Sequence, residues 1–295
     1  MNVISIGEVL WDVVAPNEHL GGAPFNFAAH LKRLGHEVWF VSAVGNDPRG
    51  ARIVERMAAM GLASRYVRRN AQYATGSVTV TLKAAGQPEF VIHRPAAYDF
   101  PELSPAMLRE LSSQSVNWIY FGTLLQMSSP AHELTSRILG ALPKARRFYD
   151  VNLRVGCWTP ALVRELMEQA TVVKLNEDEV EAIAGAFGTK HDSLEQFCRS
   201  YARQFRWEGV CVTRGVAGCA LLLGNEYVEA EGYRVTVADA VGAGDAFAAT
   251  FLHGLGSGWP AVRIADFANR VGALVASRSG AIPDWNFEEV AQLQH

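Results

Sequence analysis

The sequence predicts an α/β fold in which a mostly parallel central sheet is covered by helices on both faces, giving three layers, with a small β lid attached. Short apolar segments with strand character alternate with amphipathic helical segments along most of the chain, and this alternation is typical of parallel sheets. Residues 75–96 break the alternation with two period-two stretches around a turn. A chain of 295 residues suits one large domain. We therefore expect residues 1–295 to form a single α/β domain with the lid as an appendage.

The elements of the main layers follow from the spacing of apolar residues. Expected strands are short apolar runs rich in β-branched and aromatic residues, at 3–10, 37–45, 116–124, 146–154, 171–177 and 209–215. Expected helices place apolar residues three or four positions apart, at 26–35, 49–62, 104–112, 133–142, 159–170 and 193–205.

The segment 75–96 has the pattern of a β-hairpin closed by the turn Ala85-Gly86-Gln87-Pro88. A hairpin inserted between strand–helix units does not easily join a parallel sheet, so we expect it to project as a flap or a small second sheet. Residues near Trp11 to Leu20 are its expected partners, and the predicted lid spans about 11–20 and 73–98. The alternative is that the hairpin forms an antiparallel edge of the main sheet.

Composition and charge exclude several classes of protein. Hydrophobic residues make up 49% and charged residues 19%, and the formal net charge is −3, so nucleic acid is not an expected partner. The four cysteines form no Cys-x-x-Cys pair and fit reduced thiols. The apolar N-terminal stretch carries Glu8 and Asp12 and no basic region, unlike a signal peptide. No apolar run approaches the roughly 20 residues of a membrane span. We therefore expect a cytoplasmic protein with no membrane partner.

Several common catalytic motifs are absent, and one glycine-rich segment takes their place. The sequence has no Walker loop, no G-x-G-x-x-G after the first strand, no H-E-x-x-H and no G-x-S-x-G. Residues 239–245, DAVGAGD, lead instead into the apolar helical segment AFAATFLHGL. Free amides of Gly242, Ala243 and Gly244 at such a helix start can bind an anion, and Asp245 beside them can act as a general base. The alternative is an acidic residue in the first turn that only stabilises the helix.

A second polar cluster lies between residues 12 and 35. Gly21 and Gly22 let the backbone approach a ligand closely, and Asn26 follows at the start of a helix. An amide side chain donates to and accepts from hydroxyl groups, whereas the carboxylate of Asp12 accepts from them. Together these residues suit a polyol. The alternative assigns the glycines to a turn, Asn26 to a cap and Asp12 to a solvated strand end.

The segment KLNEDEVEAIAG places Asn176 and Glu179 three residues apart at a strand-to-helix junction. Because they share one helix face, their oxygens suit a hydrated Mg²⁺ ion. A capping box that begins at Asn176 explains the same residues equally well.

These motifs, in this order, resemble the ribokinase-like (PfkB) carbohydrate kinase family, and within it the bacterial fructokinases most. The first family signature is matched from Gly21 through Asn26 to Gly45, and the second by DAVGAGD followed by AFAAT. The second departs from the family pattern at Ala240 and Thr250, and neither departure removes an amide donor or the base. Further matching blocks are DVNLR at 150–154, NEDE at 176–179, VTRGVAG at 212–218 and ANRVGALVASRSGAIP at 268–283.

The resemblance implies a role for each matching residue. Asp245 deprotonates the acceptor hydroxyl, and the amides from Gly242 to Gly244 stabilise the transferred phosphoryl group. Glu179 positions Mg²⁺ through water, and Asp239 belongs to a K⁺ site. Sugar contacts fall on Asp12, Gly22, Asn26, Arg94, Asn152 and Arg154, and nucleotide contacts on Asn176, Thr213, Gly215, Gly218 and Asn269.

The reaction that the resemblance implies is transfer of the γ-phosphoryl group of MgATP to a primary hydroxyl of a ketose, O6 of fructose. Ribose, 2-keto-3-deoxygluconate or a nucleoside is the alternative acceptor within the same fold, and a non-catalytic sugar sensor is the alternative outside enzymes. The expected partners are a sugar and ATP. In some relatives the lid pairs with that of a second subunit while others are monomers, so a homodimer through the lid is left open.

Overall fold

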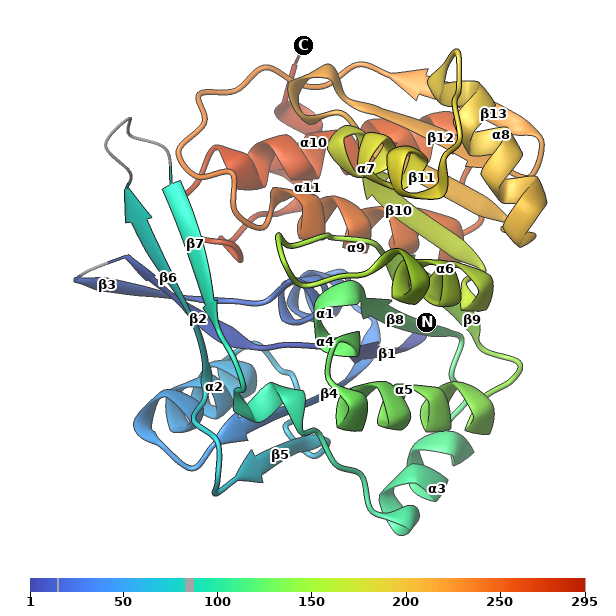
Figure 1. Cartoon of the computed structure of the whole chain (residues 1–295). Helices are drawn as coiled ribbons and strands as arrows, with labels where there is room; N and C mark the ends of the chain where they lie inside the picture. The colour runs from blue at the N-terminus through green and yellow to red at the C-terminus, as the bar shows by residue number, and fades with distance from the viewer. Residues whose placement is uncertain (15, 83–87, 295) are drawn as a thin grey trace.

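A nine-stranded sheet forms the centre of the molecule (Figure 1). The computed structural model describes residues 1–14, 16–82 and 88–294. In sheet order the strands are β13 (Glu226–Ala230), β12 (Cys219–Leu223), β11 (Gly209–Thr213), β10 (Val172–Asn176), β9 (Arg146–Asp150), β8 (Trp118–Gly122), β1 (Asn2–Ile6), β4 (Glu37–Gly45) and β5 (Val67–Asn70). Neighbours pair in parallel from β11 to β5, and β12 and β13 close one edge in antiparallel pairing.

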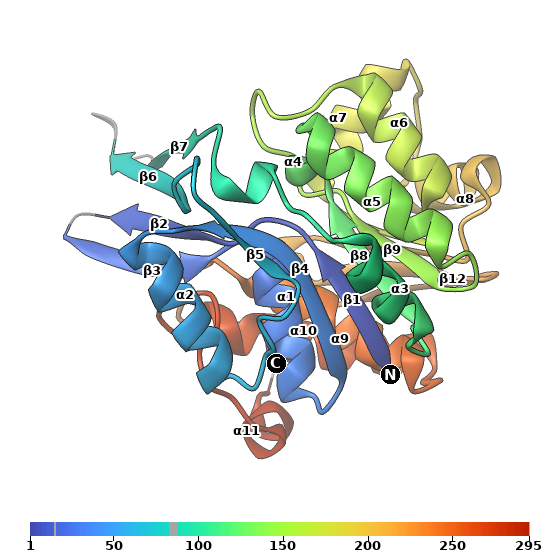
Figure 2. The same cartoon turned by 90° about the horizontal axis from the view of Figure 1, so that it is seen from below.

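Helices cover both faces of this sheet, and Figure 2 shows the two groups on opposite sides of it. One face carries α1 (Ala23–Arg33), α2 (Pro48–Ala59), α9 (Ala243–Gly256), α10 (Ala261–Ala276) and α11 (Phe287–Gln292). The other face carries α3 (Pro105–Ser113), α4 (Thr123–Gln126), α5 (Ser129–Ala141), α6 (Pro160–Gln169), α7 (Glu177–Phe187) and α8 (Leu194–Phe205). Two short 3₁₀ helices lie at Ala97–Asp99 and Gly215–Ala217.

The sequence of β1 shows why the sheet needs cover on both sides. Val3 packs into the core beneath α1, α9 and α10, whereas Ile4 packs into the core beneath α5, α6 and α8. Neighbouring residues of a strand point to opposite faces, so a strand that is apolar at every position must be buried twice. The predicted three-layer α/β/α architecture with a mostly parallel sheet is confirmed.

Local sequence also sets where α2 begins and which face it buries. Asp47 accepts a hydrogen bond from the amide of Gly50 at 2.8 Å, and Pro48 occupies the first helical position. Ile53 and Met57, four residues apart, are both buried. The side chains on the other faces of α2 therefore remain free to make surface contacts.

A second, four-stranded sheet projects from the main body at the left of Figure 1. It contains β3 (Asn17–Gly21), β2 (Leu10–Val14), β6 (Gly76–Leu82) and β7 (Pro88–His93), in that order. The expected hairpin is present as β6 and β7. It pairs with β2 and so belongs to the separate sheet. The alternative prediction, an antiparallel edge of the main sheet, is wrong.

Several predicted elements differ in extent from the observed ones. The strand expected at 3–10 is split, because β1 ends at Ile6 and β2 starts at Leu10 in the other sheet. Between them Gly7 lies against α1 so closely that a Cβ would be 2.0 Å from Pro24 Cγ. Strands β5, β12 and β13 were not predicted from the sequence. The turn expected at 85–88 falls largely outside the described residues.

Across the described ranges, no helix combines the length and apolar character needed to cross a membrane.

Candidate active site

The predicted site residues gather at the carboxyl ends of the parallel strands. β1 lies between β4 and β8, so successive strand–helix units extend the sheet in opposite directions from it. Ligands of open α/β sheets bind at the strand ends beside such a reversal. Asn176 and Thr213 end β10 and β11, while Asp12 follows β1 after a short turn.

The glycine loop before α9 has the conformation of an anion site. Gly242 has a φ of 83°, and a Cβ there would be 2.4 Å from the carbonyl oxygen of Ala281. Glycine is therefore required by both the backbone angle and the packing. Within the described chain, the amides of Gly242 and Gly244 make no hydrogen bond, and that of Ala243 makes only a long one of 3.4 Å to Ala240. These free donors sit at the positive end of a 14-residue helix.

Asp245 lies in the first turn of α9, beside those amides. Its Oδ2 accepts a hydrogen bond of 2.8 Å from Nδ2 of Asn26 on α1. Burial, together with the charge of Asp150, raises the pKa of Asp245 to about 6, although Asn26, Lys174 and Arg154 oppose the rise. A carboxylate with this pKa is ionised at neutral pH and yet accepts a proton more readily than an ordinary aspartate.

Asp239, the other carboxylate of the loop, is engaged by backbone. Oδ1 accepts from the amide of Val241 at 3.0 Å, and Oδ2 accepts from the amide of Gly280 at 3.2 Å. Asp239 thereby joins the glycine loop to the segment after α10. The expected K⁺ role of Asp239 stays a prediction.

The Gly-Gly cluster brings a second carboxylate to the same region. Gly22, the N-cap of α1, has a φ of 109°, and a Cβ there would be 2.5 Å from the Glu8 carbonyl oxygen. A Cβ at Gly21 would be 2.5 Å from Asp12 Oδ2, so the Asp12 carboxylate lies directly over the glycine pair. Burial raises the pKa of Asp12 to about 6, against the lowering effect of Arg154.

Arg154 is the cation that faces these acids. Its charge lowers the pKa values of Glu8, Asp12 and Asp245 alike. Arg154 is exposed, and its side chain makes no ion pair or hydrogen bond with any described residue. The structure thus brings Arg154, Asp12, Asn26 and Asp245 together, as the sequence motifs predict. Asn152, two residues earlier, holds an unusual left-handed φ of 40°.

Arg94 is held differently from the other predicted sugar contacts. Its guanidinium donates to both carboxylate oxygens of Asp99, at 2.5 and 3.2 Å, and to the carbonyl of Leu124 at 3.0 Å. This pairing fixes the end of β7 against the main body. Contact between Arg94 and a substrate stays a prediction.

Asn176 and Glu179 form the capping box that was the alternative prediction for these residues. Asn176 Oδ1 accepts from the Glu179 amide at 2.8 Å, and Glu179 Oε2 accepts from the Asn176 amide at 2.9 Å. Glu179 Oε1 also accepts from the amide of Leu153 at 2.7 Å. Each carboxylate oxygen keeps a lone pair, so Glu179 still fits a role as acceptor from a metal-bound water. No cluster of three or more His, Cys, Asp or Glu side chains suited to a metal occurs in the part of the chain that the structure describes.

Four of the residues expected to touch a nucleotide lie near strands β11, β12 and β13, at one edge of the sheet. Thr213 ends β11, and Gly215 and Gly218 have φ values of 55° and 94° in the turn to β12. Gly218 packs so tightly that a Cβ would be 2.0 Å from the Ala230 carbonyl oxygen. Asn269 on α10 donates to the Glu231 carbonyl at 3.0 Å and is largely buried. Asn269 therefore has a demonstrated structural contact, while its nucleotide contact stays a prediction.

A buried ion pair beneath the glycine loop was not predicted from the sequence. Lys174 Nζ donates to Asp150 Oδ1 at 2.9 Å, and Tyr120 donates to Asp150 Oδ2 at 2.9 Å. Burial alone lowers the pKa of Lys174, but the nearby carboxylates raise it overall. Lys174 Nζ lies 3.8 Å from where a Cβ of Gly244 would be. The signal in the sequence that could have indicated this ion pair is a lysine inside the apolar run VVKLN.

Glu8 is a second residue of this region to which the sequence motifs assigned no role. It is 4% exposed, and its Oε2 has no hydrogen-bond partner in the described chain. Burial raises the pKa of Glu8 to about 7, although Arg154 and the amide of Ala23 oppose the rise. The signal in the sequence that could have indicated a role for Glu8 is an acidic residue in the apolar segment IGEV, just after β1.

A carboxylate beside free amides at a helix start is an arrangement suited to phosphoryl transfer, and comparison with known proteins identifies the family. The family model described as pfkB family carbohydrate kinase matches residues 4–287. The chain therefore belongs to the pfkB family of carbohydrate kinases, and the predicted ribokinase-like fold is confirmed.

Individual relatives agree with this family. A fructokinase from Klebsiella pneumoniae is 30% identical over 80% of this chain and 76% of its own length. A putative sugar kinase from Pyrococcus horikoshii is 27% identical over 95% of this chain and 91% of its own. The structure of an uncharacterized sugar kinase from Pyrococcus horikoshii in complex with ATP has a TM-score of 0.83 at 25% identity, covering 98% of this chain and 99% of that one.

Proposed function

We propose that this carbohydrate kinase transfers the γ-phosphoryl group of ATP to a primary hydroxyl of a ketose, O6 of fructose. The observation that carries the proposal is the position of Asp245. Its carboxylate has a raised pKa, is oriented by Asn26, and lies beside the free amides at the start of α9.

In the proposed reaction, Asp245 accepts the proton of the acceptor hydroxyl as that oxygen bonds to the γ-phosphorus. The bond from the γ-phosphorus to the bridging β–γ oxygen breaks, and ADP leaves with that oxygen. The free amides of Gly242 and Gly244 are proposed to stabilise the negative charge that gathers on the transferring group. Asp245 then carries the proton that the sugar lost, so the charges balance.

Contacts to the acceptor are proposed for the residues around the glycine pair. Asp12 accepts hydrogen bonds from two adjacent hydroxyls, and the Oδ1 of Asn26, which is buried without a partner among described residues, accepts another. Gly22 lets the sugar approach the backbone. The relative named fructokinase, at 30% identity, supports fructose over ribose, 2-keto-3-deoxygluconate or a nucleoside.

ATP is proposed to lie along the carboxyl ends of β10 and β11, near Thr213 and Gly215. The ATP complex of the Pyrococcus horikoshii protein supports a nucleotide in this fold. Mg²⁺, when bound, neutralises charge on the phosphates. Glu179 and Asn176 are the residues proposed to orient its waters, and Asp239 is the residue proposed for K⁺.

The small sheet is proposed to act as a lid over the acceptor. It carries Asp12 on β2 and ends beside Arg94, so its movement changes the acceptor side of the site. Val14 and Val91 each expose 45% of their surface on this sheet. Pairing of two lids in a homodimer is a further proposal, which sedimentation velocity tests.

A panel of acceptors tests the proposed function. Purified protein is assayed for ADP formation with fructose, ribose, 2-keto-3-deoxygluconate and a nucleoside, with and without Mg²⁺ and K⁺. We expect fructose to give the highest kcat/KM, by at least about tenfold. A higher value for another acceptor would overturn the fructose assignment, and ATP-independent sugar binding without turnover would identify a sensor.

A further inference from the structure

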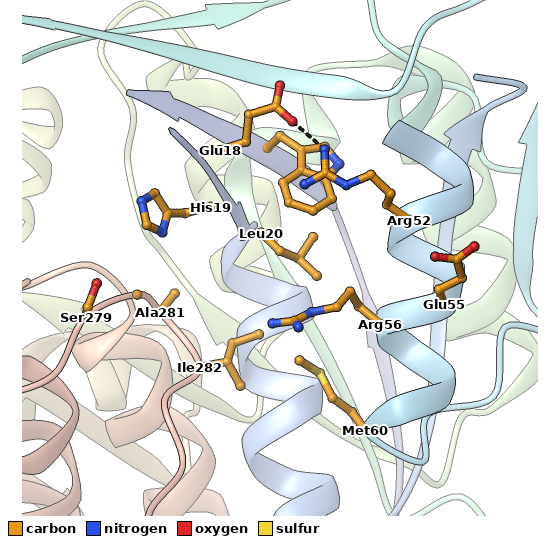
Figure 3. A pocket seen from close by; sticks show the side chains of 12 residues that line it. Glu18, His19, Leu20, Arg52, Glu55, Arg56, Met60, Ser279, Ala281 and Ile282 are labelled. Atoms are coloured by element: carbon orange, nitrogen blue, oxygen red, sulfur yellow. Dashed lines mark hydrogen bonds and ion pairs between the residues drawn. The ribbon is translucent and has the colours of Figure 1, made fainter. Parts of the chain in front are cut away.

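A cavity of about 460 Å³ lies outside the site described above, between the small sheet, α2 and the segment after α10 (Figure 3). Its walls come from β2 and β3, from α2 and from residues 279–282. None of the residues proposed to contact sugar or nucleotide lines it. On β2 and β3, Trp11 and Leu20 are paired and line the cavity, whereas the next residue, Asp12, points to the opposite face of the sheet.

Two arginines of α2 reach this cavity, and they are in different states. Arg52 stacks over the ring of Trp11 at 4.1 Å and pairs with Glu18 at 2.6 Å. The side chain of Arg56, one helical turn later, makes no hydrogen bond or ion pair with any residue that the structure describes. Figure 3 shows its guanidinium extending away from α2 toward Leu20 and Ile282. A cation held over an apolar wall without a counter-charge is a ready partner for an anion.

The acids near the cavity leave this positive charge uncompensated. Glu18 is bound by both Arg49 and Arg52, whose hydrogen bonds lower its pKa. In Figure 3 the carboxylate of Glu55 stays beside its own helix, away from the guanidinium of Arg56. The cavity therefore offers a free cation at its α2 side.

The remaining walls combine apolar surface with small polar groups. Leu20, Met60 and Ile282 form an apolar surface around the Arg56 side chain. Ser279 lies across the cavity from α2, and its hydroxyl can donate to and accept from hydroxyl groups, whereas His19 is paired with Asp12 and its side chain lies on the face opposite to Leu20. Such a surface suits a ligand with an anionic end and a hydroxyl-bearing body.

We propose that this cavity is a second ligand site, which binds a sugar phosphate. A phosphate monoester presents three acceptor oxygens, enough for Arg56 and for the free edge of Arg52 one turn away, whereas a carboxylate presents two. The volume is in the range of small-molecule sites, about 300–1,000 Å³. The sugar body lies against Leu20 and Ile282, and its hydroxyls face Ser279.

The cavity shares a wall with the anion site. Gly280 donates its amide to Asp239, and Ala281 packs against Gly242. His30 on α1 contacts the same segment, with Nε2 3.1 Å from the Ala281 carbonyl oxygen. A ligand against residues 279–282 therefore acts on the backbone that shapes the glycine loop, and its binding alters kinase turnover.

Isothermal titration calorimetry without nucleotide tests the binding directly, and it needs no turnover. The probes are fructose 1-phosphate, glucose 6-phosphate and inorganic phosphate, against the wild type, Arg56→Gln, Arg203→Gln and Asp12→Asn. Arg203 is a matched control, an exposed arginine on α8 far from the cavity. Asp12→Asn weakens the acceptor site alone.

We expect one of the sugar phosphates to bind the wild type with a Kd below about 1 mM. Arg56→Gln should weaken it at least about tenfold, and Arg203→Gln and Asp12→Asn should leave it unchanged. Binding lost in Asp12→Asn would place the ligand in the acceptor site and overturn the proposal, as would equal binding by Arg56→Gln or no saturable binding. Inorganic phosphate binding as tightly as the sugar phosphates would overturn the sugar assignment.

Turnover assays test the link to the anion site. Bound sugar phosphate should change kcat/KM of the wild type and leave Arg56→Gln unaffected. An equal response of both proteins would overturn the coupling. Failure of the protein to phosphorylate fructose would leave the calorimetric result intact, so the two proposals fail separately.

Discussion

Asp245 and Asp239 belong to one seven-residue loop, yet their contacts give them different roles. Asp239 accepts two backbone amides and joins two segments, whereas Asp245 has a single side-chain donor, Asn26. The amide of Asn26 orients the proposed base and also lowers its pKa. The residue proposed to bind the acceptor therefore also tunes the pKa of the residue proposed to deprotonate it.

Replacing Asn26 by alanine is expected to shift the pH dependence of catalysis. Asp245 must be ionised to accept a proton, so kcat/KM falls as pH drops below about 6. Without the Asn26 donor the pKa of Asp245 rises, and this acid limb moves to higher pH. The measurement is kcat/KM between pH 5 and 9.

Asn152→Gly is the control, because it removes another asparagine of the region that makes no hydrogen bond to Asp245, at a φ of 40° that glycine adopts freely. In Asn152→Gly the acid limb of the kcat/KM profile should stay at the same pH as in the wild type. An unchanged limb in Asn26→Ala would contradict the tuning role.

At the residue scale, the neighbours of a side chain are predictable from the sequence where a motif fixes both the residue type and its position in the fold. Asp245, Asn26 and Gly22 meet as expected because the motifs sit at helix starts on adjacent elements. The Lys174–Asp150 pair was not predicted, since it joins β10 to β9 and depends on strand order. Glu179 shows the other limit, because a cap and a metal-water acceptor require the same residue types.

At the element scale, the start of α9 uses its two glycines for different reasons. Gly242 has a positive φ and no room for a Cβ beside Ala281. Gly244 is helical, and a methyl group added there would meet Lys174 Nζ at 3.8 Å, an ordinary contact. Gly242 is needed for the fold of the loop. Gly244 has no side chain, so the space in front of the free amides stays open for a ligand.

Alanine substitutions separate the two reasons. Gly242→Ala should lower the unfolding midpoint by several degrees. Alanine would be strained at the positive φ of this position, and its Cβ would lie too close to Ala281. Gly244→Ala should keep or slightly raise the midpoint, since alanine favours helix, while kcat/KM falls at least about tenfold. Calorimetry and kinetics on both variants provide the measurements. Equal midpoints for the two variants would contradict the assignment.

The elements themselves were predicted unevenly. Strands buried on both faces and helices with a regular apolar spacing were found, because local pattern specifies them. The edge strand β13 was missed, since an edge strand needs fewer apolar residues and Glu226 and Glu229 interrupt its pattern. The strand inside it, β12, is apolar and buried and was missed as well. The split between β1 and β2 was missed because it depends on the close approach of Gly7 to Pro24, which is a tertiary contact.

At the scale of the whole molecule, a buried histidine on α1 helps to join this helix to the segment after α10. His30 donates from Nε2 to the Ala281 carbonyl, and Trp285 donates to His30 Nδ1 at 3.1 Å. These partners require the neutral ring. Burial lowers the pKa of His30 to about 4, while Ala281 opposes the shift.

The stability of the fold should therefore depend on His30 in acid. The folded pKa lies below the unfolded value of about 6.5, so the folded state binds fewer protons. Its contribution is complete above pH 6.5 and is lost as pH falls toward 4. Between pH 7 and pH 5 the loss is about 2 kcal/mol of unfolding free energy.

His30→Gln keeps a donor for Ala281 but cannot titrate. Urea unfolding at pH 7 and pH 5 should show a smaller loss in this variant than in the wild type, by about 2 kcal/mol. His93→Gln is the control, because His93 is exposed at the end of β7 and should leave the wild-type loss unchanged. The same loss in His30→Gln as in the wild type would contradict the role of His30.

The central claim is that the fold brings a base and an anion site together for phosphoryl transfer, and the D245N variant tests it most directly. Asparagine keeps the shape and the neighbours of Asp245 but cannot accept the proton. We predict that kcat falls by about 10²–10⁴-fold, while the Kd for ATP changes by less than about twofold. Turnover within about tenfold of the wild type, with ATP still bound, would contradict the assignment of Asp245 as the base.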